Sequence, residues 1–315
     1  ERELRNMLAD VLKTCLNIRK NEVVLIVTDD DKLEVAAELE SAARRLSDEI
    51  LLIKMRPRSH HAEEPPRVVA QAMKNSEVVI APTTFSLTHT DARKKACEAG
   101  ARVATMPGIT MEMLREGALL ADYNVVKKRT EKIAKVLTKA KEIRIKTSLG
   151  SEFSASLKGR KGIADSGIIT KRGAFGNLPA GEAFIAPVEG SSSGVLVFDG
   201  SFSSVGILSE LLRLRIEKGK VANCYGSSAE RMMQMLRKYK NASNVAEIGI
   251  GTNEKARLTG NILEDEKVFG TAHAALGDNH TFGGKTRAEI HLDGIIKKPN
   301  VWLDGKQIML EGELL

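Results

Sequence analysis

The chain has 315 residues, which is more than one compact hydrophobic core usually holds, so two domains are expected. Apolar residues make up 42% of it. Its net charge of +7 does not indicate nucleic-acid binding, because the 48 basic residues are interspersed with 41 acids and only 4% of residues are aromatic. No apolar run approaches the roughly 18 residues of a membrane-spanning helix, so neither nucleic acid nor a membrane is an expected partner.

The first half of the sequence alternates helices and strands. Apolar positions at helical spacing predict a helix over 3–18, and the apolar run 23–27 predicts a strand buried on both faces. Asp29 to Asp31 are expected to cap a helix that continues to about residue 46. Further strands are predicted over 50–55, 77–81 and 102–105, and further helices over 68–74 and 90–98, the last ended by Gly100. This order is typical of a doubly wound, mostly parallel sheet.

The second half changes character near residue 142. A long helix over about 122–141 is expected to lead out of the first domain. Beyond it, segments 143–147 and 153–157 alternate with period two, and short strands with glycine-containing turns follow, interrupted by one helix over about 228–238. We therefore predict an α/β N-terminal domain over 1–141 and an α+β domain rich in antiparallel sheet over 142–315.

Three of the six histidines lie in the stretch 270–293, which ends in His291-Leu292-Asp293. In an extended segment, residues two apart point to the same face, so His291 and Asp293 converge on one point. An imidazole and a carboxylate placed in this way suit a divalent metal ion. A surface pair is the alternative for an isolated His-x-Asp, and the nearby histidines and acids favour the metal site.

A second segment with room for a ligand is 244–251. Alternation places Ala246, Ile248 and Ile250 on one side of this predicted strand. The other side carries Glu247 beside two glycines, which leaves space for a metal ion, water or substrate to approach the backbone. An edge strand with a bulge is the alternative interpretation.

Several segments together resemble the aminopeptidase T metallopeptidase family. They are NLPAGEAFIAP (177–187), VFDGS (197–201), AEIGIGTN (246–253), DEKVFGTAHAALG (265–277) and IHLD (290–293). The stretch 86–110 is similar to the N-terminal domain of that family. The resemblance implies two domains, a homodimer and a catalytic domain that binds two divalent metal ions, with Zn, Co or Mn suited to mixed imidazole and carboxylate ligands.

The resemblance also implies roles for particular residues. The metal ligands it implies are Glu182, Glu247, His273, His291 and Asp293. Glu182 or Glu266 would be the general base, and His280 stands where the peptidases carry a tyrosine, as a substitute ligand or proton donor. The implied function is an aminopeptidase that removes N-terminal residues from short peptides with a water activated by two metals.

A ring-cleaving dioxygenase is the alternative. His273, His291 and Asp293 alone form a set of two imidazoles and one carboxylate, which can hold a single non-haem Fe(II) ion with positions open for a small-molecule substrate and dioxygen. A dihydroxypyridine ring-cleaving dioxygenase resembles the same family, and the loss of the tyrosine and of one acid beside Glu182 favours this interpretation. A scaffold protein without enzymatic activity is disfavoured, because clustered carboxylates are costly without a cation.

Cysteine usage indicates a cytoplasmic protein. Cys15, Cys97 and Cys224 are odd in number and far apart, so they predict free thiols rather than a disulfide framework. No secretory signal is expected at the start of the sequence, Glu1 to Leu4.

Overall fold

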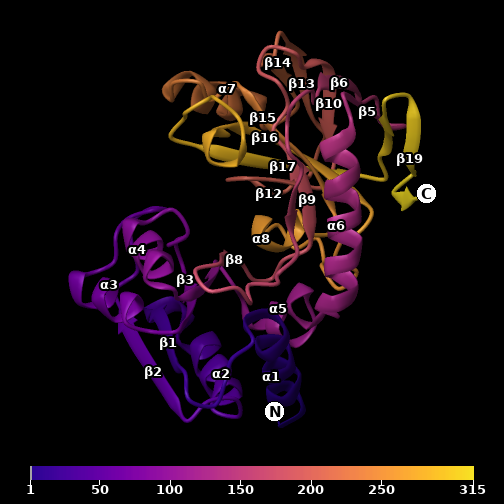
Figure 1. Ribbon diagram of the computed structural model, residues 1–315. Coiled ribbons are helices and arrows are strands. Elements are labelled where there is room, and N and C mark those ends of the chain that lie inside the picture. The colour runs from indigo at the N-terminus through magenta and orange to yellow at the C-terminus, as the bar shows by residue number, and fades with distance from the viewer. Residues whose placement is uncertain (1) are drawn as a thin grey trace. The chain divides into compact units, whose positions relative to one another are not determined.

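The computed structural model describes residues 2–315 and divides into two compact units. The first unit combines the chain up to Lys127 with Asp165–Ala180, and the second combines Lys128–Ala164 with Gly181–Leu315. Figure 1 follows the chain through both units. The division differs from the expected one at 141/142, because the long helix α6 (Tyr123–Lys139) packs its apolar side into the core of the second unit.

The first unit is built on a five-stranded sheet with all strands parallel, in the order β2-β1-β3-β4-β8. The strands are β1 (Val23–Asp29), β2 (Glu49–Met55), β3 (Val78–Thr83), β4 (Arg102–Pro107) and β8 (Phe175–Asn177). The helices are α1 (Arg2–Leu16), α2 (Leu33–Ala43), α3 (Arg67–Lys74), α4 (Asp91–Ala99) and α5 (Met111–Arg115), with short 3-10 helices η1 (Asp30–Lys32) and η2 (Ala118–Leu120). The predicted α/β class is confirmed, since α1 packs on α2 and α3 on α4 around a sheet whose central strands are buried.

Two helix ends of this unit illustrate how far local sequence decides structure. α4 begins as predicted, with the Thr90 hydroxyl accepting a hydrogen bond from Arg93 N, and it ends at Gly100, which adopts φ 109°. The predicted capping by Asp29 to Asp31 is wrong. A 3-10 turn intervenes before α2, and the Asp29 carboxylate instead accepts hydrogen bonds from the backbone N–H and hydroxyl of Thr84 in the loop after β3.

The second unit contains an eight-stranded and a seven-stranded sheet. The first has the order β14-β13-β10-β6-β5-β18-β19-β20, with β14 (Lys220–Tyr225), β13 (Leu212–Glu217), β10 (Ser193–Phe198), β6 (Glu152–Ser156), β5 (Glu142–Lys146), β18 (Asn300–Leu303), β19 (Lys306–Leu310) and β20 (Glu313–Leu314). The second has the order β12-β11-β17-β16-β15-β9-β7, with β12 (Gly206–Ile207), β11 (Ser201–Phe202), β17 (His291–Lys297), β16 (Thr271–Gly277), β15 (Val245–Gly251), β9 (Glu182–Ile185) and β7 (Ile163–Asp165). The helices are α6, α7 (Ala229–Lys238) and α8 (Ile262–Asp265), with the 3-10 turn η3 (His280–Phe282).

One hydrophobic core joins the two sheets of the second unit. It includes Ile145 and Leu196 from the larger sheet and Ile248, Ile250 and Leu276 from the smaller one. Side chains alternate along each strand, so the strands β9, β15, β16 and β17 send their other residues to the face of the smaller sheet that points away from this core. That face is called the outer face below.

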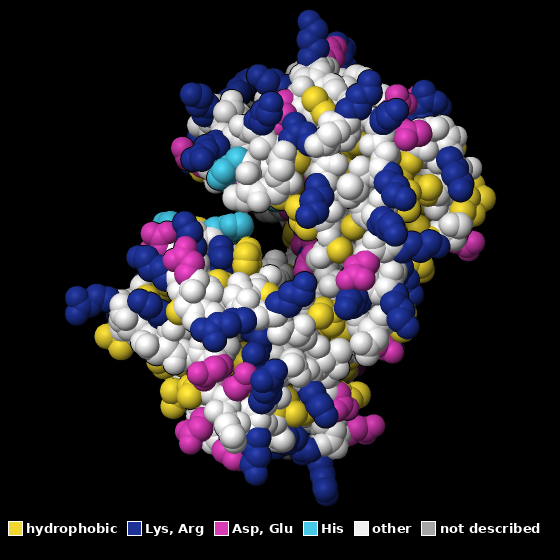
Figure 2. All heavy atoms as spheres, in the orientation of Figure 1, with side chains coloured by type: hydrophobic (Ala, Val, Ile, Leu, Met, Phe, Trp, Pro, Cys, Tyr) yellow, Lys and Arg dark blue, Asp and Glu magenta, His cyan; other side chains and the backbone are white. Residues whose placement is uncertain are grey.

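The described residues 2–315 include no helix that is long and apolar enough to cross a membrane. Figure 2 shows Lys and Arg spread over the visible surface with Asp and Glu among them, as the interspersed charges of the sequence predict. Cys15 is buried, Cys97 and Cys224 are half-buried, and all three are free thiols, as predicted.

A nearly buried ion pair in the first unit is expected to stabilise the fold in a pH-dependent way. Arg102 at the start of β4 binds Glu22 before β1, at 2.6 Å, with only 9% and 14% of the two side chains exposed. Burial raises the pKa of Glu22, but the Arg102 guanidinium outweighs it, so the net shift is downward. Because the folded pKa lies below the unfolded value of about 4.3, the stabilisation is present above that pH and is lost as the pH falls through the folded pKa.

We expect Glu22→Gln to lower the free energy of unfolding by about 2 kcal/mol at neutral pH, since a charged hydrogen bond is lost beside a nearly buried guanidinium. Urea denaturation followed by circular dichroism measures this difference, which should shrink under acid conditions. The control is Glu40→Gln, which removes the exposed pair with Arg44 and should cost about 0.5 kcal/mol or less. Equal effects of the two substitutions at all pH values would contradict the prediction.

Candidate metal centre

Four adjacent strands direct acids and imidazoles to the outer face of the seven-stranded sheet. They carry Glu182 on β9, Glu247 on β15, His273 on β16, and His291 and Asp293 on β17. Figure 1 shows these strands side by side in the second unit. All five residues were predicted as ligands, and the antiparallel register brings them together from positions up to 111 residues apart, Glu182 to Asp293.

Small residues in the middle of the sheet allow these side chains to meet. Glu247 lies opposite Ala275, which lies opposite Asp293, so the row across the three strands has only a methyl group at its centre. Gly249 lies opposite His273, and a β-carbon at Gly249 would come within 1.9 Å of His273 Nε2. The imidazole therefore lies across β15 over Gly249, and this brings its Nε2 to 2.9 Å from Glu182 Oε2 on the next strand.

The converging atoms form two overlapping sets. Glu182, Glu247 and His273 offer ligand atoms that lie within 4.8 Å of one another, and so do Glu247, His291 and Asp293. Glu247 belongs to both, with Oε1 at 3.4 Å from His273 Nε2 and Oε2 at 3.6 Å from His291 Nε2. Asp293 Oδ1 lies 3.5 Å from His291 Nε2.

Several of these atoms have no hydrogen-bond partner although they are buried. They are Glu182 Oε2, His273 Nε2 and Asp293 Oδ1. Buried polar atoms are normally satisfied, and an imidazole nitrogen facing two carboxylate oxygens is a donor set that a divalent cation satisfies. His291 is oriented for the same purpose, since its Nδ1 lies 2.9 Å from the Asp278 carbonyl oxygen and its Nε2 faces the carboxylates. The residues present therefore fit a divalent metal ion.

The acids and bases of this face shift one another's protonation. Burial alone lowers the pKa of His273, but the Glu182 and Glu247 carboxylates outweigh it and raise the pKa to about 10. Asp293 and Glu247 likewise overcome burial and raise the pKa of His291 well above its usual value. Burial raises the pKa of Glu247, and the neighbouring carboxylates add to the increase. Without a metal ion, protons on the imidazoles therefore balance part of the negative charge.

Sequence reasoning missed one residue of this cluster, Lys267. Its side chain is fully buried, and its ammonium donates hydrogen bonds to Glu182 Oε1 at 2.6 Å and to Glu266. Burial would raise the pKa of Glu182, but Lys267 and His273 lower it to about 2. The signal was available, since Lys267 lies inside the segment DEKVFGTAHAALG that carries the family resemblance.

The two remaining predicted site residues occupy different surroundings. Glu266 belongs to the cluster because it accepts a hydrogen bond from Lys267. Burial, and then repulsion from Glu182, raise its pKa to about 8. His280 lies on η3, where its side chain is 37% exposed and Nδ1 is 2.8 Å from Asp278 Oδ1. It belongs to neither set of converging ligand atoms.

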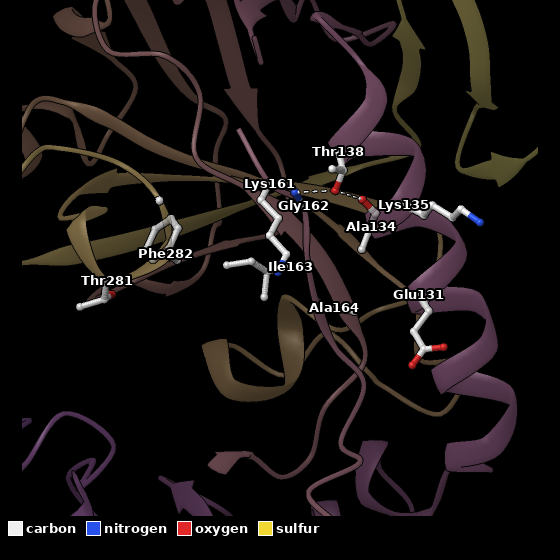
Figure 3. Close-up of a pocket in the computed structure, with 11 residues that line it drawn as sticks. Glu131, Ala134, Lys135, Thr138, Lys161, Gly162, Ile163, Ala164, Thr281 and Phe282 are labelled. Carbon is white, nitrogen blue, oxygen red and sulfur yellow. Dashed lines mark hydrogen bonds between the residues drawn. The ribbon is translucent and has the colours of Figure 1, made fainter. Parts of the chain in front are cut away.

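An aromatic row borders the metal ligands. The Phe282 ring packs edge-on against His291, with 5.7 Å between ring centroids, and against Phe184 at 5.5 Å. Phe282 also lines a cavity of about 520 Å³ between α6, the segment 161–164 and η3. Figure 3 shows how the Thr138 hydroxyl, hydrogen-bonded to Gly162 N and Ala134 O, joins α6 to that segment. None of the five converging ligands lines the cavity, and its lining residue Phe282 contacts His291.

Comparisons with known proteins identify a matching family and similar solved structures. The family model of NicX, 2,5-dihydroxypyridine 5,6-dioxygenase, matches residues 3–315. The 2,5-dihydroxypyridine 5,6-dioxygenase of Pseudomonas putida is 24% identical over 260 residues, which cover 78% of this chain and 73% of that protein. The solved dihydroxypyridine dioxygenase from strain KT2440 of that organism has a TM-score of 0.85 and 20% identity, covering 100% of this chain and 97% of the other. Wild-type AmpT from Thermus thermophilus has a TM-score of 0.74 and 15% identity, covering 100% and 99%.

These findings correct the functional prediction. The resemblance to aminopeptidase T is confirmed for the fold alone, since AmpT shares the architecture at 15% identity. The prediction of an aminopeptidase, a hydrolase of the metalloprotease type, is wrong, because the family match and the curated relative are ring-cleaving dioxygenases. The role of Glu182 or Glu266 as the general base of peptide hydrolysis is withdrawn with it. The alternative of a dioxygenase on the same scaffold agrees with these findings.

The position of Gly249 makes a prediction for cation binding. We expect Gly249→Ala to weaken Mn²⁺ binding about tenfold, a change of ~1.4 kcal/mol, because the added methyl group displaces the His273 ring, which faces Glu247, the acid that both sets share. Isothermal titration calorimetry gives the affinity, and circular dichroism checks the fold. The control is Ile250→Val on the core face of the same strand, which should lower stability slightly and leave Mn²⁺ affinity unchanged. Unchanged affinity in Gly249→Ala would contradict the proposed position of the ion.

Proposed function

The chain belongs to the 2,5-dihydroxypyridine 5,6-dioxygenase family, and we propose that it is an Fe(II)-dependent dioxygenase that opens the ring of a hydroxylated pyridine. The observation that carries this proposal is the convergence of Glu247, His291 and Asp293 on the outer face, in a chain matched by the family model from residue 3 to residue 315. In such a reaction both atoms of dioxygen enter the product. The bond between two ring carbons breaks, and the substrate supplies all the electrons.

The ligands we assign to the iron are Glu247, His291 and Asp293, whose ligand atoms lie within 4.8 Å of one another. The expected set of His273, His291 and Asp293 does not converge in this way, since His273 faces Glu247 from the other set. An iron ion held by these residues would keep coordination positions open for substrate and dioxygen. Asp278 holds His291 in the orientation that presents Nε2. Gly249 provides the space in which the His273 ring lies.

The aromatic row supports a flat, partly apolar substrate. Phe282 lies between Phe184 and His291 and packs perpendicular to both rings, and small-molecule sites typically combine such apolar walls with a few polar groups that fix orientation. Glu266 is a candidate proton acceptor at this site. Burial raises its pKa to about 8, and a carboxyl group with that pKa exchanges protons near neutral pH. A dihydroxypyridine carries acidic hydroxyl groups whose protons such a carboxylate can receive.

The activity can be tested directly. Protein reconstituted with Fe(II) under anaerobic conditions should consume one O₂ per 2,5-dihydroxypyridine when air is admitted, with loss of the ring absorbance. His291→Ala should lower kcat/KM at least about 1,000-fold, because losing an iron ligand removes several kcal/mol of transition-state stabilisation. An oxygen electrode and a spectrophotometer measure both quantities. Turnover by chelator-treated protein, or inertness of the loaded protein toward every dihydroxypyridine isomer, would disprove the proposal.

Metal binding should also release protons. In the metal-free protein Asp293 and Glu247 raise the pKa of His291 well above its usual value, so its imidazole is protonated near neutral pH and an incoming ion must displace that proton. Affinity for Fe(II) or Mn²⁺ should therefore rise with pH up to the raised pKa. Calorimetric titration in buffers of different ionisation enthalpy counts the released protons. A count of zero would show that the ion binds elsewhere.

A further inference from the structure

Lys267 is a buried cation placed within the candidate metal centre. None of its side chain is exposed, and its backbone is fixed in the turn after α8, where its N–H donates to the Glu264 carbonyl and its carbonyl accepts from Asn253 N. Gly251 permits this turn to approach the sheet, since a β-carbon there would lie 2.0 Å from the Val268 carbonyl oxygen. A buried ammonium is costly unless it is paired, and here two carboxylates pair with it.

Glu182 divides its two oxygens between this ammonium and the metal ligands. Oε1 accepts a hydrogen bond from Lys267 Nζ at 2.6 Å. Oε2 lies 2.9 Å from His273 Nε2 and has no hydrogen-bond partner of its own. A metal ion bound by the set Glu182, Glu247 and His273 would therefore share one carboxylate with a fixed positive charge.

That arrangement penalises one of the two possible ion positions. Like charges that share a buried carboxylate repel strongly, because the protein interior screens them poorly. Neither Glu182 nor Glu266, the two carboxylates that pair with Lys267, belongs to the set Glu247, His291 and Asp293, so an ion bound there shares no carboxylate with these two ion pairs. The two sets share Glu247, so the geometry by itself would allow one ion or a bridged pair.

We propose that Lys267 takes the place of a second metal ion and limits the centre to a single divalent cation. The inference rests on the proposed function, because it concerns the same centre, and it assigns a positioning role to a residue that does not itself bind the ion. In a bridged pair, some coordination positions of each ion would be taken up by the ligands that the two ions share. A single ion leaves those positions open. Glu182 then acts by orienting His273 and by binding Lys267.

The experiment counts ions in the full chain. Wild type, Lys267→Met and Lys267→Arg are stripped of metal, saturated with Mn²⁺ and desalted, and the Mn²⁺ content per chain is measured by mass spectrometry. Electron paramagnetic resonance distinguishes isolated from exchange-coupled ions. We expect one uncoupled ion in wild type and Lys267→Arg, and two coupled ions in Lys267→Met. Lys255→Met, on an exposed turn, is the control and should bind one.

The outcomes separate this inference from the proposed function. Two ions in wild type, or one ion in Lys267→Met, would overturn the role of Lys267 even if ring cleavage is observed. No bound ion in wild type would overturn both. If Lys267→Met does not fold, Lys267→Gln replaces it, since glutamine keeps a polar contact to the carboxylates without the charge, and the same counts decide.

Discussion

Four carboxylates lie close together at the outer face of one sheet, three of them on its strands and Glu266 just after α8, and the cations that balance them determine what the site can bind. Glu182 and Glu266 share the ammonium of Lys267, while Glu247 and Asp293 face two imidazoles. In a poorly solvated environment this much negative charge cannot remain unbalanced. The raised pKa values of His273 and His291 express the same constraint, since without a metal ion protons take its place. Metal binding and protonation are therefore alternatives at this centre.

Small apolar residues of the sheet allow these charged side chains to approach one another. Neighbouring strands lie about 4.8 Å apart, so side chains two strands apart meet only if the strand between them carries something small. Ala275 fills that role between Glu247 and Asp293, and Gly249 between His273 and Glu182. The hydrophobic core on the other face fixes the register, because a one-residue slip would turn Glu247 into the apolar core and Ile248 toward the ligands on the outer face. Core packing and ligand geometry are thus set by the same alternation.

The sequence predicted the parts of this architecture that depend on local periodicity. The parallel sheet, the end of α4 at Gly100 and the convergence of acids and histidines on β-strands all follow from spacing and residue type. Long-range features could not be read in this way. The return of 165–180 to add β8 beside β4, and the use of Asp29 to bind Thr84 instead of capping α2, depend on contacts between distant segments. Lys267 was missed because a lone lysine in a sequence is usually a solvated side chain.

The functional prediction was wrong for a related reason. Ligand residues of the same types, in the same order along the chain, are compatible with both a pair of metal ions and a single one, so the ligand pattern identifies the scaffold before it identifies the reaction. What distinguishes the reactions lies between and beside the ligands. Phe282 packs against His291 and Phe184, and the buried ammonium of Lys267 donates a hydrogen bond to Glu182. Such groups change the charge and the shape of the space around an ion without changing its ligands, so one fold can support different chemistry.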